Sequence, residues 1–150
     1  MSCATKNESD LLAVKERLLA KHHLKAVISM PDDLFYPVGV VTCIMVFEAN
    51  KPNKGRKTWF GYFKDDGFEK RKYIGRIDVK DRYTNLKRRL LSAYLNLDEI
   101  PGLSVRHEVS ATDEWCAEAY METDYSTLLT SDFDKKIREY CAFKLLTNLK

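Results

Sequence analysis

The stretch LKAVISMPDDLFYPVGVVTCIMVF, residues 24–47, holds two apolar runs separated by a turn. Ala26, Val27 and Ile28 form the first run, which predicts a strand over residues 24–30. Pro31-Asp32-Asp33 is typical of a turn. Residues 40–47 are rich in β-branched side chains and are apolar on both faces. They therefore predict a second, central strand of a sheet that is covered on both sides.

The segment before this stretch has the pattern of an amphipathic helix over residues 8–21. Leu11, Val14 and Leu18 are spaced to form one apolar stripe, and Thr5-Lys6-Asn7-Glu8 has the form of a capping box. A helix between strands is the rhythm of an α/β sheet. Because no strand precedes the helix in this sequence, we expect the first strand of the unit to lie upstream, and the amino terminus to be cut rather than natural.

The residues after the two strands predict shorter elements. We expect a polar loop at 50–58, an antiparallel aromatic strand at 59–63 (WFGYF), a tight turn at 65–67 and an extended segment at 104–109. Helices are predicted at 83–97 and from 131 to about 149. Between the turn and the first of these helices, the side chains expected to be half-buried are Tyr73, Ile74, Ile77 and Val79.

Residues 112–121 are ambiguous between helix and loop. If they are helical, Glu114, Glu118 and Glu122 recur every four residues and form one acidic face. That face, next to Trp115, could dock a basic partner surface. His107 has no recognisable catalytic partner, and the neighbours His22 and His23 are expected at a solvated helix end rather than on a metal.

Composition limits the class of protein. The chain has 150 residues, of which 45% are hydrophobic and 31% charged, which is typical of one soluble domain. No apolar run approaches the ~20 residues that span a bilayer, and no signal peptide is visible, so we expect a cytoplasmic protein without membrane contact. The four cysteines have neither zinc-site nor disulfide-framework spacing and are interpreted as buried reduced thiols.

The net charge of +3 is distributed unevenly along the chain. Residues 51–76 contain nine Lys and Arg against three Asp and Glu, whereas residues 108–134 contain no Lys or Arg. Two faces with different partners are therefore expected.

Three segments carry a family resemblance: residues 24–47, residues 57–68 (KTWFGYFKDDGF) and residues 113–125 (DEWCAEAYMETDY). They are similar to the modification subunits of type I restriction–modification systems, which are adenine-specific N6 DNA methyltransferases. The resemblance implies an α/β fold, namely the carboxy-terminal part of a Rossmann-like methyltransferase sheet plus an α+β tail. Residues 1–50 would end the core as helix, strand and hairpin strand, 51–80 would be a basic antiparallel extension, and 81–150 a mainly helical tail.

The motifs that carry the family's chemistry do not occur in this sequence. The family binds S-adenosylmethionine at a glycine-containing loop and holds the target amine with an Asn-Pro-Pro-Phe or Asn-Pro-Pro-Tyr motif, yet the four prolines here are never paired. Transfer requires the donor and the amine held at near-attack distance. We therefore assign no catalytic, cofactor-binding or metal residue, and expect S-adenosylmethionine in the complete subunit but no methyltransferase activity from this chain alone.

Two groups of residues are candidates for DNA contact. The resemblance implies that the loop entering the hairpin strand carries an aromatic ring that stacks on the flipped target base, here Phe35 or Tyr36. The alternative is that Phe35 is a core anchor and Tyr36 a plain surface residue. Cations that could bind the DNA backbone, or be solvated loop charges instead, are Lys51, Lys54, Arg56, Lys57, Lys70, Arg71, Lys72 and Arg76.

Two hypotheses of function remain open at this stage. The first is a fragment of an S-adenosylmethionine-dependent DNA adenine methyltransferase that contributes DNA and target-base contacts. The second is a stand-alone non-catalytic module that binds DNA or another subunit. The expected partners are DNA, the upstream half of the methylase, and the specificity and restriction subunits. A truncated sheet exposes strand edges and apolar surface, so we also expect a homo-oligomer when the chain is isolated.

Overall fold

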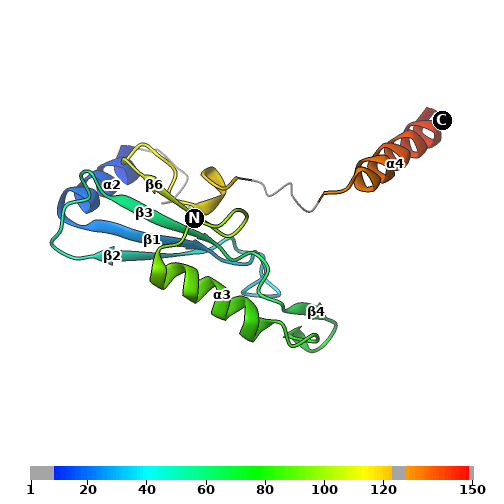
Figure 1. Ribbon diagram of the computed structural model, residues 1–150, viewed down its shortest axis with the longest axis horizontal. Coiled ribbons are helices and arrows are strands. Elements are labelled where there is room, and N and C mark those ends of the chain that lie inside the picture. The colour runs from blue at the N-terminus through cyan, green and yellow to red at the C-terminus, as the bar shows by residue number, and fades with distance from the viewer. Residues whose placement is uncertain (1–8, 123–127, 149–150) are drawn as a thin grey trace.

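The computed structural model describes residues 9–122 and 128–148, so the predicted capping box at 5–8 lies outside the described residues. The chain forms a small sheet with helices, a two-stranded hairpin and a separate last helix (Figure 1). In chain order the elements are α2 (Ser9–Lys21), β1 (His23–Ser29), β2 (Cys43–Glu48), β3 (Lys57–Tyr62), β4 (Glu69–Arg71), β5 (Gly75–Ile77), α3 (Tyr83–Asn96), β6 (Ser104–Glu108), the 3-10 turn η1 (Ala117–Ala119) and α4 (Thr130–Asn148).

The four-stranded sheet has the order β2-β1-β3-β6 and is mixed, which confirms the predicted α/β class. β1 and β2, which lie within the two predicted strand segments or overlap them, pair antiparallel, with Leu24 opposite Phe47. β3 was expected to be antiparallel, but it runs parallel to β1, with Ala26 opposite Trp59 and Ser29 opposite Tyr62. The reason is that β2 ends beside the start of β1, with Glu48 opposite His23, and the short β2–β3 connection then starts β3 at this same end of the sheet. The antiparallel neighbour of β3 is β6.

The prediction that residues 40–47 form a central strand is wrong for this chain, because β2 lies at an edge of the sheet. Its side chains are half-buried or exposed, and Ile44 is 48% exposed. The strand has the apolar character of an inner strand, but among the described residues nothing pairs with its outer edge.

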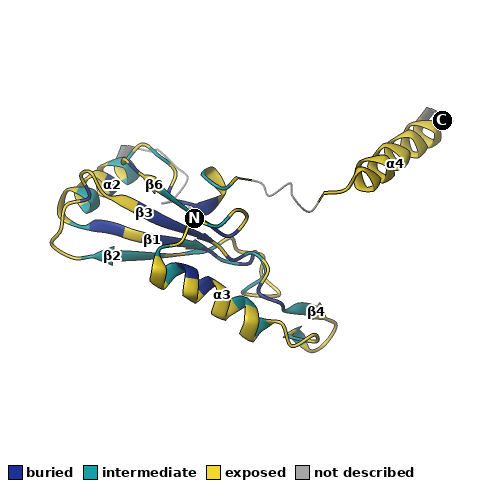
Figure 2. Cartoon of the chain, viewed as in Figure 1, coloured by how far each residue is buried: buried dark blue, intermediate teal, exposed yellow. Residues whose placement is uncertain are grey.

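The sheet packs on both faces, and Figure 2 shows the buried positions along its middle strands. On one face Leu24, Val27 and Phe60 form a cluster with Trp115, which α2 and the η1 segment cover. On the other face Ala26 and Trp59 join a second cluster that includes Leu90 and Ala93 of α3. A register shift between Leu24 and Ala26 places Leu24 and Val27 on the same face.

Trp59 fixes how α3 lies on the sheet. Its indole Nε1 donates to the carbonyl of Asp98 at 3.0 Å, and its ring lies 5.4 Å from that of Tyr94. The six-membered ring lies directly over Gly61, where an added Cβ would approach it to 2.5 Å. The β3–α3 packing therefore requires a residue without a side chain at position 61.

The structure corrects three further expectations. The segment 68–80 contains the β4–β5 hairpin, in which Tyr73, Ile74, Ile77 and Val79 are exposed rather than half-buried. Within residues 109–121 only Ala117–Ala119 is helical, so the predicted acidic helix face does not form. Of the cysteines in the described part of the chain, Cys43 is half-buried, Cys116 is buried and Cys141 is exposed, which contradicts the expectation that all are buried.

α4 lies apart from the sheet in Figure 1, and all its described side chains are exposed. Its apolar side chains Phe133, Ile137 and Tyr140 are 56–60% exposed. They lie three and four residues apart, which places them along one side of the helix. No helix in the described residues is long and apolar enough to cross a bilayer.

Candidate nucleic-acid interface

The candidate site lies where the two parallel strands end. Ser29, the last residue of β1, is paired with Tyr62, the last residue of β3. The loop of residues 30–42 therefore leaves the sheet beside the segment that leads to the β4–β5 hairpin. Ligands of α/β sheets bind outside the carboxyl ends of parallel strands, so this end is the first place to look for function.

The loop after β1 carries the two predicted stacking aromatics. Phe35 is 57% exposed and Tyr36 is 45% exposed, so the alternative that Phe35 is a core anchor is wrong. The base of the loop is closed by a backbone hydrogen bond, which Met30 N donates to Thr42 O at 3.0 Å. Both rings are thus presented on a closed loop at the carboxyl end of β1, and their stacking role stays a prediction.

Arg76 ties the hairpin to this aromatic loop. Its Nη2 lies 3.1 Å from Asp33 Oδ1 in the loop and 2.7 Å from Asp66 Oδ1 before the hairpin. The side chains of Arg76 and Asp66 are only 12% and 7% exposed, and the Arg76 guanidinium lies over the ring of Phe68 at 5.3 Å. This predicted DNA contact is therefore largely occupied by two carboxylates.

Lys70 adds a second tie between the hairpin and the loop. Its Nζ is 3.5 Å from Asp33 Oδ2 and 6.0 Å from the centre of the Tyr36 ring. The side chain remains 55% exposed, so the ammonium group is open to solvent beside the aromatic loop. Arg71 and Lys72 follow it on the hairpin, and both are exposed.

A second charged network lies at the carboxyl ends of β1 and β3. Lys64 Nζ bridges Asp32 at 2.6 Å and Glu118 at 3.0 Å. Ser29 Oγ donates to Glu118 Oε2 at 2.5 Å and accepts from the Ala117 N–H at 3.1 Å. These contacts fasten η1 to the end of β1.

The network controls the charges of its own members. Burial raises the pKa of Glu118, but the hydrogen bond from Ser29 and the nearby Lys64 outweigh burial and hold the pKa below 4.5. Burial lowers the pKa of Lys64, but hydrogen bonds to Asp32 and Glu118 outweigh it and raise the pKa above 10.5. Both groups are therefore charged around neutral pH.

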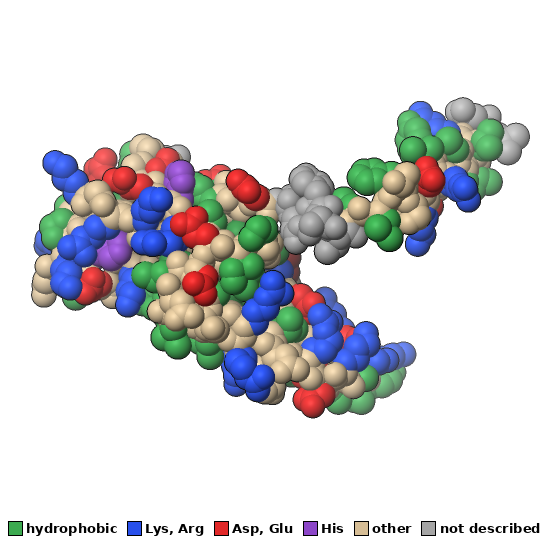
Figure 3. Space-filling model, in the orientation of Figure 1, with side chains coloured by type: hydrophobic (Ala, Val, Ile, Leu, Met, Phe, Trp, Pro, Cys, Tyr) green, Lys and Arg blue, Asp and Glu red, His purple; other side chains and the backbone are tan. Residues whose placement is uncertain are grey.

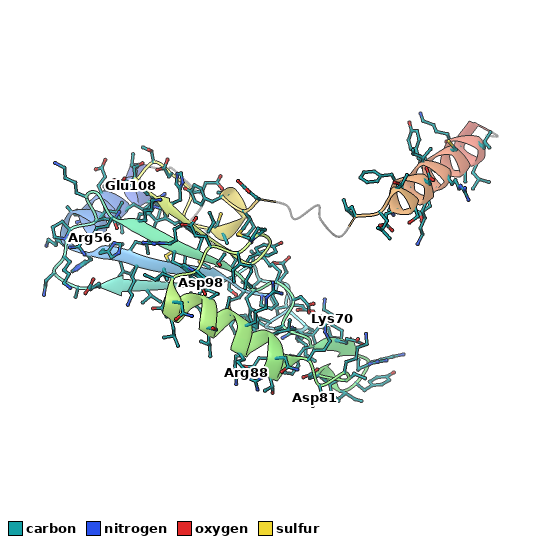
Figure 4. All side chains as sticks on the ribbon, in the orientation of Figure 1. Arg56, Lys70, Asp81, Arg88, Asp98 and Glu108 are labelled. Carbon is teal, nitrogen blue, oxygen red and sulfur yellow. The ribbon has the colours of Figure 1, made fainter. Side chains whose placement is uncertain are left out.

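The other predicted cations lie at the opposite end of the sheet. Figure 4 shows Arg56 and Lys70 at the two ends of the main body. Arg56 pairs with Glu48 at 3.9 Å, and Lys51 pairs with the same carboxylate. Lys54 and Lys57 are exposed beside them. The structure therefore divides the predicted basic set into two groups, one at each end.

Asn53 anchors the loop that carries this second group. Its Oδ1 accepts the Leu24 N–H at 3.0 Å and lies 2.8 Å from His23 Nδ1, and its Nδ2 donates to Val109 O at 3.3 Å. The expectation of a solvated His23 is wrong, because His23 begins β1 and is only 8% exposed. No cluster of three or more His, Cys, Asp or Glu within the described ranges could hold a metal ion.

Sequence reasoning missed the carboxylates that organise the site. The sequence pattern places Asp33 and Asp66 in turns and Glu118 on a helix face, and it indicates no ion-pair role for any of them. Asp66 does form the turn, since its Oδ1 accepts the Phe68 N–H at 3.1 Å. The one signal that could have indicated this role of the acids is the basic run that follows them in the sequence. A cation that becomes buried requires a carboxylate partner.

Comparison with known families gives the family of the chain. Residues 6–145 match the family model described as N-6 DNA Methylase. The chain belongs to the N-6 DNA methylase family. A curated relative, the type II restriction enzyme and methyltransferase RM.BcgI of Heyndrickxia coagulans, is 35% identical over 142 residues. Those residues are 93% of this chain and 22% of the relative, so the chain spans about a fifth of that protein's length.

Solved methyltransferase subunits share the fold. The type I restriction–modification methyltransferase subunit from Streptococcus thermophilus superposes with a TM-score of 0.55 at 17% identity, over 71% of this chain and 21% of its own. A second solved chain comes from a structure of the complex assembly and conformational transition of the type I restriction–modification system. It superposes with a TM-score of 0.54 at 19% identity, over 99% of this chain and 34% of its own length. At these identities the match describes the fold alone.

Proposed function

We propose that this chain is a part of an adenine-N6 DNA methyltransferase of a restriction–modification system, and that it supplies contacts to DNA and to the target base. Family membership supports the activity class. One structural observation carries the specific role: the ties of Asp33 to Arg76 and Lys70 hold an exposed aromatic pair beside a basic hairpin at the carboxyl end of two parallel strands.

The charge around this end supports contact with the DNA backbone. Figure 3 shows Lys and Arg side chains gathered over the hairpin end of the molecule. Lys70, Arg71 and Lys72 are open to solvent there, and Arg76 serves as the tie that positions them. Lys51, Lys54, Arg56 and Lys57 lie at the far end, so we assign the contact to the hairpin group.

Phe35 and Tyr36 are the candidates for stacking on a flipped adenine. Enzymes that modify a base remove it from the duplex and hold it against apolar or aromatic side chains. Stacking of a base on an aromatic ring is worth ~1–3 kcal/mol. Both rings are exposed and have no aromatic partner among the described residues, so either ring is free to stack on a base.

Methyl transfer itself we assign to residues outside this chain. S-adenosylmethionine supplies the methyl group in such an enzyme, and this sequence contains neither the family's glycine-containing donor loop nor its paired-proline motif. Incubation with labelled donor and DNA is expected to give no transfer above background. Transfer by the isolated chain would contradict this assignment.

The outer edge of β2, which pairs with no strand among the described residues, is where we expect further strands of the methyltransferase sheet to join. Val40, Val41 and Ile44 are 41–48% exposed although the segment has the composition of an inner strand. Exposed strand edges pair readily with further strands. We propose that the upstream half of the methylase adds to the sheet at this edge.

The exposed apolar side of α4 supports assembly with other subunits, including the specificity and restriction subunits, and self-association when the chain is isolated. Phe133, Ile137 and Tyr140 are too exposed for a helix that remains solitary. Light scattering at micromolar concentration is expected to show an oligomer that Phe133→Glu with Ile137→Glu converts to a monomer. A monomeric unsubstituted chain would contradict the proposal.

The test of the DNA contact is the salt dependence of binding to a labelled duplex. Substitution of Lys70 and Lys72 by Ala is expected to reduce the slope of log K against log salt by about 0.9 for each lost phosphate contact. Substitution of Lys51 and Lys54 by Ala is the matched control, with the same charge change at the far end. Equal slopes for the two double variants would remove the assignment to the hairpin.

A further inference from the structure

The tip of the β4–β5 hairpin carries two adjacent apolar side chains without a packing partner that would explain them. Tyr73 is 91% exposed and Ile74 is 70% exposed. Within the described residues, the contact recorded for the Tyr73 ring is the Lys72 ammonium group, 4.9 Å from the ring centre. In Figure 1 the hairpin projects from the main body beyond the start of α3, so it lies at one end of the main body.

The backbone at the tip is strained for the residue that it carries. Tyr73 has φ 67, the left-handed region that favours glycine, inside a turn that the Ile74 N–H closes on Arg71 O at 3.2 Å. The next residue, Gly75, has φ 93 and open space around it. A bulky residue in this conformation has a cost that packing in the folded chain does not offset. Such positions cluster at sites of function.

The positive charge beside the tip favours binding of a polyanion. The hairpin and its turn contain four cations, Lys70, Arg71, Lys72 and Arg76, against the single acid Glu69. Cations that flank a projecting apolar pair are the combination by which proteins hold DNA phosphates while an apolar wedge enters between base steps. An aromatic ring alone, or cations alone, would not distinguish a duplex from other surfaces.

The position of the hairpin relative to the aromatic loop is also fixed. Asp33 joins the loop to Arg76 and Lys70 of the hairpin at 3.1 and 3.5 Å. A base that leaves the stack for Phe35 or Tyr36 creates a gap in the duplex. A second apolar group held at a constant offset from those rings is placed to fill it.

We propose that Tyr73 and Ile74 form a wedge that enters the base stack of duplex DNA while Lys70, Arg71 and Lys72 bind the flanking phosphates. The inference rests on the proposed function, because it requires that the hairpin end contacts DNA. It adds residues and a role that the stacking loop does not supply. The wedge stabilises the opened duplex, and its gain is largest where a base is already missing.

The test compares two short duplexes of the same sequence, one intact and one with a single abasic site next to a 2-aminopurine. The unsubstituted chain is expected to bind the abasic duplex about tenfold more tightly, a ratio typical of one stacked ring, and to quench the 2-aminopurine. Tyr73→Ala with Ile74→Ala is expected to lose the preference and the quenching but to keep the salt slope. Leu95→Ala, which removes an exposed apolar side chain of α3 outside both proposed contacts, is the control and is expected to keep the preference and the quenching.

The outcomes separate the two proposals. Salt-dependent binding with no preference for the abasic duplex, or a preference that the tip variant keeps, overturns the wedge and leaves the DNA contact standing. An absence of salt-dependent binding to either duplex overturns both. Anionic vesicles are the third arm: binding to them that depends on Tyr73 and Ile74, without the abasic preference, would assign the tip to a lipid surface and overturn the wedge.

Discussion

Arg76 Nη2 lies 3.1 Å from Asp33 Oδ1, although Asp33 belongs to the loop after β1 and Arg76 to strand β5 of the hairpin. Asp66 shares the same guanidinium nitrogen at 2.7 Å, so one cation joins three segments. Because Arg76 is nearly buried, this joint is a stronger restraint than an exposed ion pair. The aromatic loop and the hairpin are therefore expected to move as one unit.

Substitution Arg76→Met tests the joint. Methionine keeps an apolar side chain beside Phe68, but Asp66 loses its ion pair and Asp33 keeps only its weaker one with Lys70. We expect a loss of about 2 kcal/mol in the free energy of unfolding, the range for hydrogen bonds to charged groups. Hydrogen exchange of the β4 and β5 amides should accelerate far more than exchange in β1 and β3.

The matched control is Lys80→Met, which removes a pair with Glu69 whose side chains are 63% and 34% exposed. This pair should contribute little to stability, because exposed ion pairs are weak. Similar exchange in the two variants would show that Arg76 does not hold the hairpin.

The sheet could be predicted from the sequence where local pattern decides it. Residues 24–30 and 40–47 each contain a short, mostly apolar run, which favours a buried strand. The structure has β1 at His23–Ser29 and β2 at Cys43–Glu48. The pairing partners could not be predicted. Whether β3 lies parallel to β1 depends on the direction of a short connection, and whether β2 is central depends on strands that pair with its outer edge.

The candidate residues of the site follow from the sequence and their role stays a prediction, but their arrangement could not be predicted. Phe35, Tyr36 and the basic set were identified from the family resemblance and from charge, and the structure places Lys70 beside Tyr36 while Arg56 lies at the far end. The missing information was the position of the acids. Asp33 and Asp66 determine which cations are occupied, and such pairings across loops leave no periodic trace in the sequence.

Gly61→Ala is expected to weaken the packing of α3 on the sheet. The new Cβ would lie 2.5 Å from the Trp59 ring, which is buried and held by its hydrogen bond to Asp98. Overpacking of this kind costs about 2 kcal/mol. Gly39→Ala is the control, because no atom lies within 4 Å of its added Cβ. In chemical denaturation, the denaturant concentration at the unfolding midpoint should fall for Gly61→Ala and stay unchanged for Gly39→Ala. An unchanged midpoint for Gly61→Ala would show that the Trp59 ring moves aside freely.

Glu118→Gln is expected to change how the free energy of unfolding depends on pH in acid. The pKa of Glu118 is held below 4.5 in the folded chain, so its charged form stabilises the fold above that pH. This contribution is lost as the pH falls below 4.5 through the lower folded pKa. The difference in unfolding free energy between the native chain and Glu118→Gln should therefore be largest near neutral pH and shrink in acid.

Lys64→Met provides the second arm of this test. Without the Lys64 ammonium group, 3.0 Å from Glu118, burial has less opposition and the pKa of Glu118 rises. The loss of stability on acidification should then be smaller than in the native chain and should be complete at a higher pH, because it ends at the folded pKa of Glu118. Urea unfolding across a pH series gives both curves, and superimposable curves would show that the Ser29–Glu118–Lys64 network does not contribute.

Tyr73→Gly is expected to stabilise the isolated chain. Tyr73 has φ 67 and is 91% exposed, so the folded state bears the cost of a left-handed bulky residue and gains little burial in return. Glycine removes that cost, which is roughly 1 kcal/mol, while Tyr73→Phe keeps it and should be neutral. Thermal unfolding of the three chains measures the order. A gain for glycine means that the ring is kept for a contact outside the folded chain, whereas a loss would mean that Tyr73 packs within it and is not available as a wedge.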